Sequence, residues 1–427
     1  MKVIITFILL TTLSPLAFAQ PNTLSVTIDT VYNVPFSIDY GYGYLSGWDD
    51  LTPIITTYID HTGTISVCSV DTNARETYIY EYTQDLRPIK TIKVSNEFEK
   101  LGAFVKDEDG NYYILSAEDV QEGAFNQKNI VITKYDSEGE KINAFYLIAQ
   151  TSDEIWARGF SGIKRPFYAG SCRMEISGDW IAVYFARQMF RARDGKNHQA
   201  SYGFILDKNT LEKIRNISMP SAGHSFNQYI LPIENGFIFA DQGDYDPRGF
   251  NFTKVQNGKS NKILKAFTFK KSRTYQYTFA QLGGLAKTSG GYIFAGTYEK
   301  NTVVSHESHN DSRNLFVLTI DEDFTSCSKP IWITAYADTN NKNAASPKIV
   351  SLEDGRYLLM WEYMVGYIPT IMQVIDESGN PLGDAVELPG IRLNRNDVLR
   401  YNRHNGKVYW AVNDGNKSII VYALEVH

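Results

Sequence analysis

Seven copies of one local pattern occur along this chain, and they restrict its fold more than any other feature. Each copy is a glycine-containing turn followed at once by a short strand with almost no polar positions, such as Gly110 before Tyr112-Tyr-Ile-Leu. Asn-Gly and Asp-Gly turns favour two-residue hairpin loops, because both central residues need positive φ. The turn glycines lie 47 to 68 residues apart and are Gly63, Gly110, Gly178, Gly236, Gly290, Gly355 and Gly406.

A second marker follows most copies. The next strand ends in an aspartate, namely Asp136, Asp207, Asp321 or Asp376, and Thr83 and Gln256 take this position in the first and fourth units. Aspartate suits a turn because its side chain accepts a hydrogen bond from the backbone two residues further on. Each unit therefore predicts four strands, A to D, with a glycine turn between A and B and an aspartate turn between C and D. A strand that is apolar on both sides, as B is here, is typical of a sheet covered on both faces.

With these units the chain resembles β-propellers over residues 20–427. The resemblance implies an all-β fold, a single domain of seven four-stranded antiparallel blades. The seventh unit ends at His427 without a fourth strand, while the alternating segment 24–32 has no unit of its own. We expect this N-terminal segment to close the ring, because closure removes exposed sheet edges. The repeat motifs of WD40, kelch and sialidase propellers are absent, so no family's catalytic residues are carried over.

The first nineteen residues have the pattern of a signal peptide. Lys2 precedes the apolar run Val3 to Leu10, and Ala17-Phe18-Ala19 provides small residues for cleavage. No later stretch has eighteen consecutive apolar residues, so no membrane span is expected. The sequence therefore predicts an exported protein, secreted or periplasmic.

Charge and cysteine content narrow the possible partners. The net charge is −6, and loss of Lys2 with the signal peptide would make it −7, which argues against nucleic acid as a partner. Cys68, Cys172 and Cys327 are too few for a disulfide framework; a single bridge is one alternative, and we expect buried thiols.

A candidate binding face follows from the lengths of the connections. In a propeller the B–C and D–A connections share one face, called the loop face here, and several of them are long and irregular in this chain. Two of them, beside blade three, are unusually basic and aromatic. Guanidinium groups bind carboxylate or sulfate through two hydrogen bonds, and aromatic rings stack on sugars. We therefore predict a site for a glycan, possibly an acidic one, on the loop face over blades three and four. Its predicted residues are Trp156, Arg158, Lys164, Arg165, Tyr168, Arg187, Gln188, Arg191, His224, Asp241 and Arg248. The alternative is a solvated surface whose cations pair with nearby acids.

Two other functions fit the same fold. The loop face suits a polysaccharide lyase or glycosidase, with His224, Tyr245 and Arg248 as candidate acid–base groups. A surface scaffold that binds a protein partner would need only an apolar patch. Nucleotide-binding and zinc-protease motifs are absent, so no cofactor is expected.

No metal is expected either. Asp241, Asp244 and Asp246 alternate in a short loop but lack the glutamate that ends a calcium-binding loop. His306 and His309 lie in a long polar loop, where no strand or helix fixes their geometry.

Overall fold

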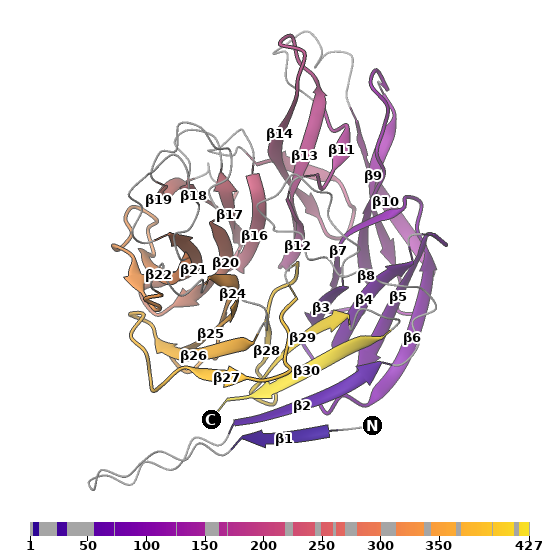
Figure 1. Ribbon diagram of the computed structural model, residues 1–427. Coiled ribbons are helices and arrows are strands. Elements are labelled where there is room, and N and C mark those ends of the chain that lie inside the picture. The colour runs from indigo at the N-terminus through magenta and orange to yellow at the C-terminus, as the bar shows by residue number, and fades with distance from the viewer. Residues whose placement is uncertain are drawn as a thin grey trace, which may run out of the picture.

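Seven antiparallel sheets form a ring in the computed structural model, and the region between their inner strands is called the channel here (Figure 1). The structure describes residues 3–7, 24–31, 55–71, 73–124, 126–149, 162–168, 170–217, 225–243, 249–258, 262–269, 280–299, 313–336, 343–363, 369–394, 396–413 and 418–426. Among them no helix is long and apolar enough to cross a membrane. The predicted all-β propeller with seven blades is confirmed.

Six blades follow the predicted A-to-D strand order. Blade one consists of β3 (Ile55–Ile59), β4 (Ile65–Asp71), β5 (Glu76–Tyr82) and β6 (Pro88–Ser95). Blade two consists of β7 (Lys100–Lys106), β8 (Tyr112–Ala117), β9 (Lys128–Tyr135) and β10 (Lys141–Ile148). Blade three consists of β12 (Cys172–Ser177), β13 (Trp180–Arg191), β14 (Asn197–Asp207) and β15 (Lys213–Asn216), with the short β11 (Arg165–Pro166) added on β13.

The remaining three of these six blades repeat the same order. Blade four consists of β16 (Ser225–Ile233), β17 (Gly236–Gly243), β18 (Gly249–Gln256) and β19 (Lys262–Thr268). Blade five consists of β20 (Gln281–Thr288), β21 (Gly291–Glu299), β22 (Arg313–Asp321) and β23 (Ile331–Trp332). Blade six consists of β24 (Ala344–Ser351), β25 (Arg356–Tyr363), β26 (Thr370–Asp376) and β27 (Val386–Leu388).

Blade seven takes only three strands from the end of the chain, β28 (Arg400–Asn402), β29 (Lys407–Asn413) and β30 (Ile419–Glu425). On its outer side β2 (Leu24–Val31) pairs antiparallel with β30, with Thr27 opposite Ala423, and β1 (Val3–Phe7) pairs with β2. That the N-terminal segment closes the ring of the mature protein stays a prediction.

The seven inner strands contact one another in order around the channel, and β28 meets β3. A hydrophobic cluster fills each of the seven junctions between neighbouring blades. At the junction of blades seven and one, for example, Val421 packs in the same cluster as Ile65 and Val67. Strand β17 is buried along its whole length, as expected for a B strand between two blades. The core is therefore a ring of sheet-on-sheet layers.

The C–D turns match the prediction closely. The Oδ1 of Asp136 accepts the backbone N–H of Glu138 at 2.9 Å, and Asp376 does the same for Ser378 at 2.9 Å. These hydrogen bonds favour the ionised carboxylate, and the pKa of Asp376 is lowered, with the hydrogen bond from the Asn380 side chain as the largest cause.

The A–B turns match it only in part. Blades three, four and five have two-residue loops between the paired strand ends, but in blade four the loop is Glu234-Asn235, and Gly236 already belongs to β17. The prediction is wrong in blades one, two and six, where the loop has three residues, and in blade seven, where four residues separate the paired Asn402 and Lys407. In blade two Asp107 donates to the carbonyl of Asn111 at 3.0 Å, and only Gly110, at φ 84°, takes positive φ. A three-residue loop combines an ordinary turn with one left-handed residue, so one glycine suffices.

Candidate functional site

Two of the basic residues predicted beside blade three, Lys164 and Arg165, lie at its junction with blade two. Strand β11 pairs with β13, which places Arg165 opposite Gln188. The Nζ of Lys164 lies 2.9 Å from a carboxylate oxygen of Glu122, and the Nε of Arg165 lies 3.2 Å from Asp119. Both acids belong to the B–C connection of blade two. These two cations thus hold that connection against blade three, as in the alternative of paired cations.

Two arginines of this cluster stack on tyrosine rings. The guanidinium of Arg165 lies 4.2 Å from the ring centre of Tyr168, and that of Arg187 lies 4.7 Å from the ring centre of Tyr202. Arg187 also donates from an Nη atom to the carbonyl oxygen of Gly162 at 2.8 Å. Stacking of this kind fixes a guanidinium plane at little entropic cost.

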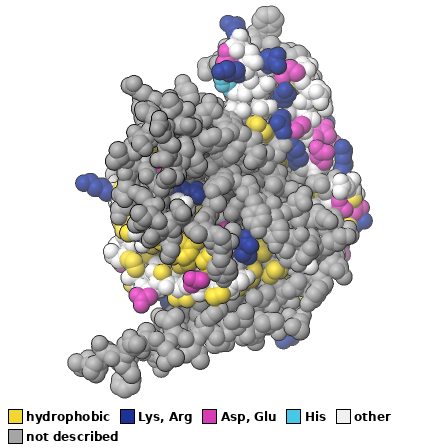
Figure 2. Space-filling view, in the orientation of Figure 1, with side chains coloured by type: hydrophobic (Ala, Val, Ile, Leu, Met, Phe, Trp, Pro, Cys, Tyr) yellow, Lys and Arg dark blue, Asp and Glu magenta, His cyan; other side chains and the backbone are white. Residues whose placement is uncertain are grey.

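The hairpin formed by β13 and β14 is longer than the other described B–C hairpins and projects beyond blade three (Figure 1). Arg191, Arg193 and Lys196 are exposed near its tip. Among the described residues no carboxylate forms an ion pair with Arg191 or Arg193. Figure 2 shows Lys and Arg side chains mixed with Asp and Glu along the described surface of blades two and three. The hairpin tip therefore presents cations whose charge is still available to a ligand.

Asp241 lies on β17 and is 1% exposed. Its Oδ2 accepts hydrogen bonds from the Tyr184 hydroxyl at 2.7 Å and from Ser201 Oγ at 3.3 Å. This carboxylate therefore joins blade four to blade three.

Several predicted residues lie outside the described residues, so the structure does not report on them. They are Trp156, Arg158, His224, Tyr245 and Arg248, together with Asp244, Asp246, His306 and His309. Within the described part of the chain, no group of three or more His, Cys, Asp or Glu side chains is arranged to hold a metal ion. Cys68 and Cys172 are buried thiols, and Cys327 is a half-buried free thiol.

A second polar cluster, which the sequence reasoning missed, spans the central channel. Arg173 on β12 donates to the carbonyl of Asn396 at 2.6 Å. Arg400 on β28 lies 2.8 Å from Glu175, also on β12. Blades three and seven are not neighbours, so both interactions bridge the channel. Arg173 and Glu175 alternate with the apolar Cys172 and Met174 in the sequence, and this alternation of charged and apolar residues was the signal that could have revealed them.

The channel walls perturb these cations in opposite directions. Burial lowers the pKa of Arg173, although Asp397 opposes this. Burial would also lower the pKa of Arg400, but Glu175 and Asp397 outweigh it, and the net pKa is raised. Arg400 is thus matched by carboxylates, whereas the Nε of Arg173 is buried and makes no hydrogen bond to any described residue.

Polar side chains also join neighbouring inner strands near their loop-face ends. The Oε1 of Gln228 accepts the N–H of Ser171 at 2.7 Å, and Asp397 Oδ2 accepts the N–H of Thr57 at 2.6 Å. Several of these strands carry a β-bulge here, as β16, β20 and β24 do. A bulge leaves backbone groups outside the ladder, and these side chains can satisfy them.

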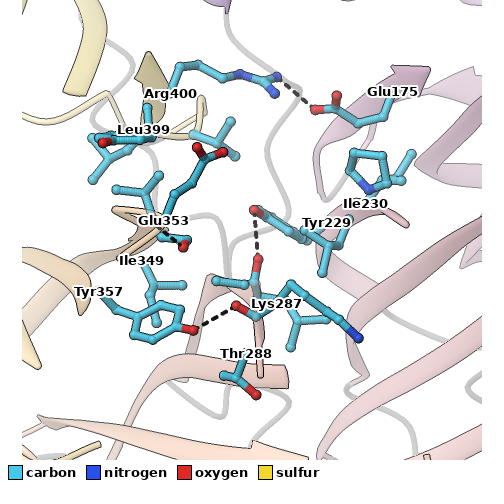
Figure 3. A pocket seen from close by; sticks show the side chains of 18 of the residues that line it. Glu175, Tyr229, Ile230, Lys287, Thr288, Ile349, Glu353, Tyr357, Leu399 and Arg400 are labelled. Carbon is cyan, nitrogen blue, oxygen red and sulfur yellow. Dashed lines mark hydrogen bonds and ion pairs between the residues drawn. The ribbon is translucent and has the colours of Figure 1, made fainter. Parts of the chain in front are cut away.

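At the opposite end, the inner strands surround a cavity of about 700 Å³. Its lining includes the A–B turns of blades five and six, so it opens on the face opposite the loop face. We call it the turn-face cavity. The Glu175–Arg400 pair lies at its edge (Figure 3). Burial raises the pKa of Tyr229, which also lines the cavity, to about 12. Sequence reasoning assigned no site to this face.

No family model matches the sequence, and a search of curated proteins finds no relative. Solved structures give distant likenesses. The lectin BP39L from Burkholderia pseudomallei has a TM-score of 0.49 at 10% identity, covering 88% of this chain and 96% of that one. A protein of unknown function from Dyadobacter fermentans has a TM-score of 0.43 at 10% identity, covering 94% and 99%. An endo-arabinase from Bacteroides thetaiotaomicron has a TM-score of 0.35 at 12% identity, covering 59% and 92%. Likenesses this distant say nothing about the ligand or activity of this chain.

Proposed function

We propose that this protein is an exported binding module that holds an acidic glycan on the loop face over blades three and four. The observation that supports this most directly is the projecting hairpin of β13 and β14. It carries exposed arginines at its tip, above Arg187, which is stacked on Tyr202. A planar guanidinium can bind a carboxylate or sulfate group through two hydrogen bonds, and a neighbouring ring offers a face for stacking on the sugar.

The paired cations of the cluster have a supporting role in this proposal. Lys164 and Arg165 are neutralised by Glu122 and Asp119, so they hold the frame against which the ligand lies. Arg191 and Arg193 keep their charge exposed and supply the attraction. A shallow site of this kind suits a glycan chain, whose charged groups repeat along its length.

The test is binding of sulfated, uronic-acid and neutral glycans on an array, repeated at low and high salt. We expect the acidic glycans to bind best and to be released at 1 M salt, because the Debye length then falls to about 3 Å. The variant with Arg191→Ala and Arg193→Ala should bind about fivefold more weakly, as expected for partly screened charge pairs. The matched control replaces exposed Lys213 and Lys265 on outer strands by alanine, which changes the net charge equally.

Equal loss of binding in both variants would attribute the effect to net charge and reject the site. Binding that prefers neutral glycans, or that does not respond to salt, would reject the acidic ligand.

We also propose that residues 1–19 are removed on export and that the segment 24–32 then closes blade seven as its fourth strand. The signal-like sequence supports removal, and the pairing of β2 with β30 supports closure. Removal would take β1 away and leave a blade of four strands.

A further inference from the structure

The turn-face cavity has the size and the mixed lining of a small-molecule site. Its volume of about 700 Å³ lies within the range of ligand pockets, roughly 300–1,000 Å³. Ile59, Ile349 and Leu399 form apolar parts of its wall. Tyr229 and Tyr357 add aromatic rings, and their hydroxyls donate to the backbone carbonyls of Leu285 and Lys287 on β20, at 3.2 and 2.8 Å. Because both hydroxyls are satisfied by the wall, the rings are fixed.

The charges that line this cavity do not cancel. Glu175 is matched by Arg400, and Lys287 is matched by Glu322, which lies outside the lining. Glu377, also in the lining, accepts hydrogen bonds from the backbone N–H and the hydroxyl of Ser289. Glu353 is exposed, and no described cation forms an ion pair with it. Its side chain extends into the space between Arg400 and Tyr229 (Figure 3). The cavity therefore presents an unmatched carboxylate among apolar and aromatic walls.

The backbone at Glu353 is in the left-handed conformation, as it is at nine other described residues that are not glycine. Its φ is +63°, a left-handed conformation that costs a residue other than glycine roughly 1–3 kcal/mol. Glycine or asparagine would adopt it more easily, and Gly355 two residues on shows that this turn accepts glycine. This turn therefore holds a charged side chain on the rim of the cavity at a position that glycine would occupy with less strain.

We propose that the turn-face cavity binds an organic cation, an ammonium group carried on an apolar body. The ammonium lies against the Glu353 carboxylate, and the apolar body fills the space between Ile59, Ile349 and Leu399. The rings of Tyr229 and Tyr357 add cation–π attraction, which is stronger for a partly desolvated cation. This site is independent of the glycan site, because it lies on the opposite face and has the opposite charge preference.

The experiment compares three ligands of equal chain length, 1-hexylamine, 1-hexanol and hexanoate, by calorimetric titration of the purified protein at pH 7. We expect saturable binding with the order hexylammonium, then hexanol, then hexanoate. Glu353→Gln should weaken hexylammonium about fivefold, the size expected for one partly exposed charge pair, and leave hexanol unchanged. The matched control is Glu387→Gln, which removes an exposed carboxylate from outer strand β27 of the same blade and should change nothing.

Three results would overturn the proposal. One is the absence of saturable binding by all three ligands, and another is hexanoate binding as tightly as hexylammonium. The third is an equal response to Glu353→Gln and Glu387→Gln, which would mean that the ammonium senses only the net charge of the protein. None of these results bears on the glycan arrays, so the two proposals fail separately.

Discussion

Replacing Glu175 by glutamine should destabilise the propeller by about 2–3 kcal/mol. The Glu175 side chain is 9% exposed and lies 2.8 Å from Arg400, which is 20% exposed. Removing one partner of a fully buried pair costs about 3–5 kcal/mol, because the remaining charge is left without a counterion. The residual exposure, and solvent in the adjoining cavity, reduce this figure. At about 2.1 cal/mol/K per residue over roughly 400 residues, the loss lowers the melting temperature by about 3 °C.

A double-mutant cycle with Arg400→Met measures this pair directly. Arg400→Met also removes a hydrogen bond from Nε to the carbonyl of Thr57, so its cost should be at least as large. The double variant should be more stable than the two single losses predict, with a coupling of about 1–2 kcal/mol in guanidinium unfolding. Lys93 and Glu76 form a pair of similar length, 2.7 Å, on the surface of blade one and serve as the control. If the coupling energy between Glu175 and Arg400 is no larger than that between Glu76 and Lys93, the contact across the channel does not stabilise the ring more than a surface ion pair does.

Two further predictions concern the ring as a whole. Deleting residues 21–34 should leave β30 with an unpaired edge, and the product should aggregate or melt at a lower temperature; an unchanged thermal unfolding curve would reject closure by this segment. Lys106→Met should cost about 3 kcal/mol in urea unfolding at pH 7, because the Lys106 Nζ lies 2.9 Å from Asp60 and 2.7 Å from Glu81, and both carboxylates would lose their buried counterion. Burial alone would raise the pKa of Asp60, but hydrogen bonds, including that from Lys106, lower it overall. The ionised Asp60 therefore stabilises the folded protein above the pKa that this group has in the unfolded chain, and the stabilisation is lost as the pH falls. The difference between Lys106→Met and the parent protein should therefore shrink below about pH 4, and a difference that grows in acid would contradict the assignment.

The parts of the fold that follow from short stretches of sequence were predictable. A glycine turn, an apolar strand and an aspartate turn are local signals, and they correctly marked the B and C strands of the blades. The loop length at Gly110 was not predictable, because a two-residue and a three-residue loop both use one Asp-Gly step and differ only in where strand pairing stops. The bulges in β16, β20 and β24 were not predictable for the same reason, since the pairing register depends on two strands rather than on one.

The candidate sites show a sharper limit. The basic cluster beside blade three was visible in the sequence because its members lie close together along the chain. Its partners were not visible: Glu122 and Asp119 come from the preceding blade and neutralise Lys164 and Arg165. Residue type alone cannot tell a cation that binds a ligand from one that binds its own protein. Arg191 differs from Lys164 because it is exposed near the hairpin tip, whereas Lys164 forms an ion pair with Glu122.

Two side-chain contacts, Arg173 with Asn396 and Arg400 with Glu175, join opposite blades across the channel. Arg173 and Asn396 are 223 residues apart in the chain, yet they meet because both lie on inner segments of blades that oppose each other across the opening. Arg400 and Glu175 repeat this contact nearer the turn face. These contacts join inner segments of non-neighbouring blades, in addition to the hydrophobic clusters between neighbouring blades. The cationic hairpin and the cavity with its unmatched glutamate therefore lie on opposite faces of one mildly acidic protein.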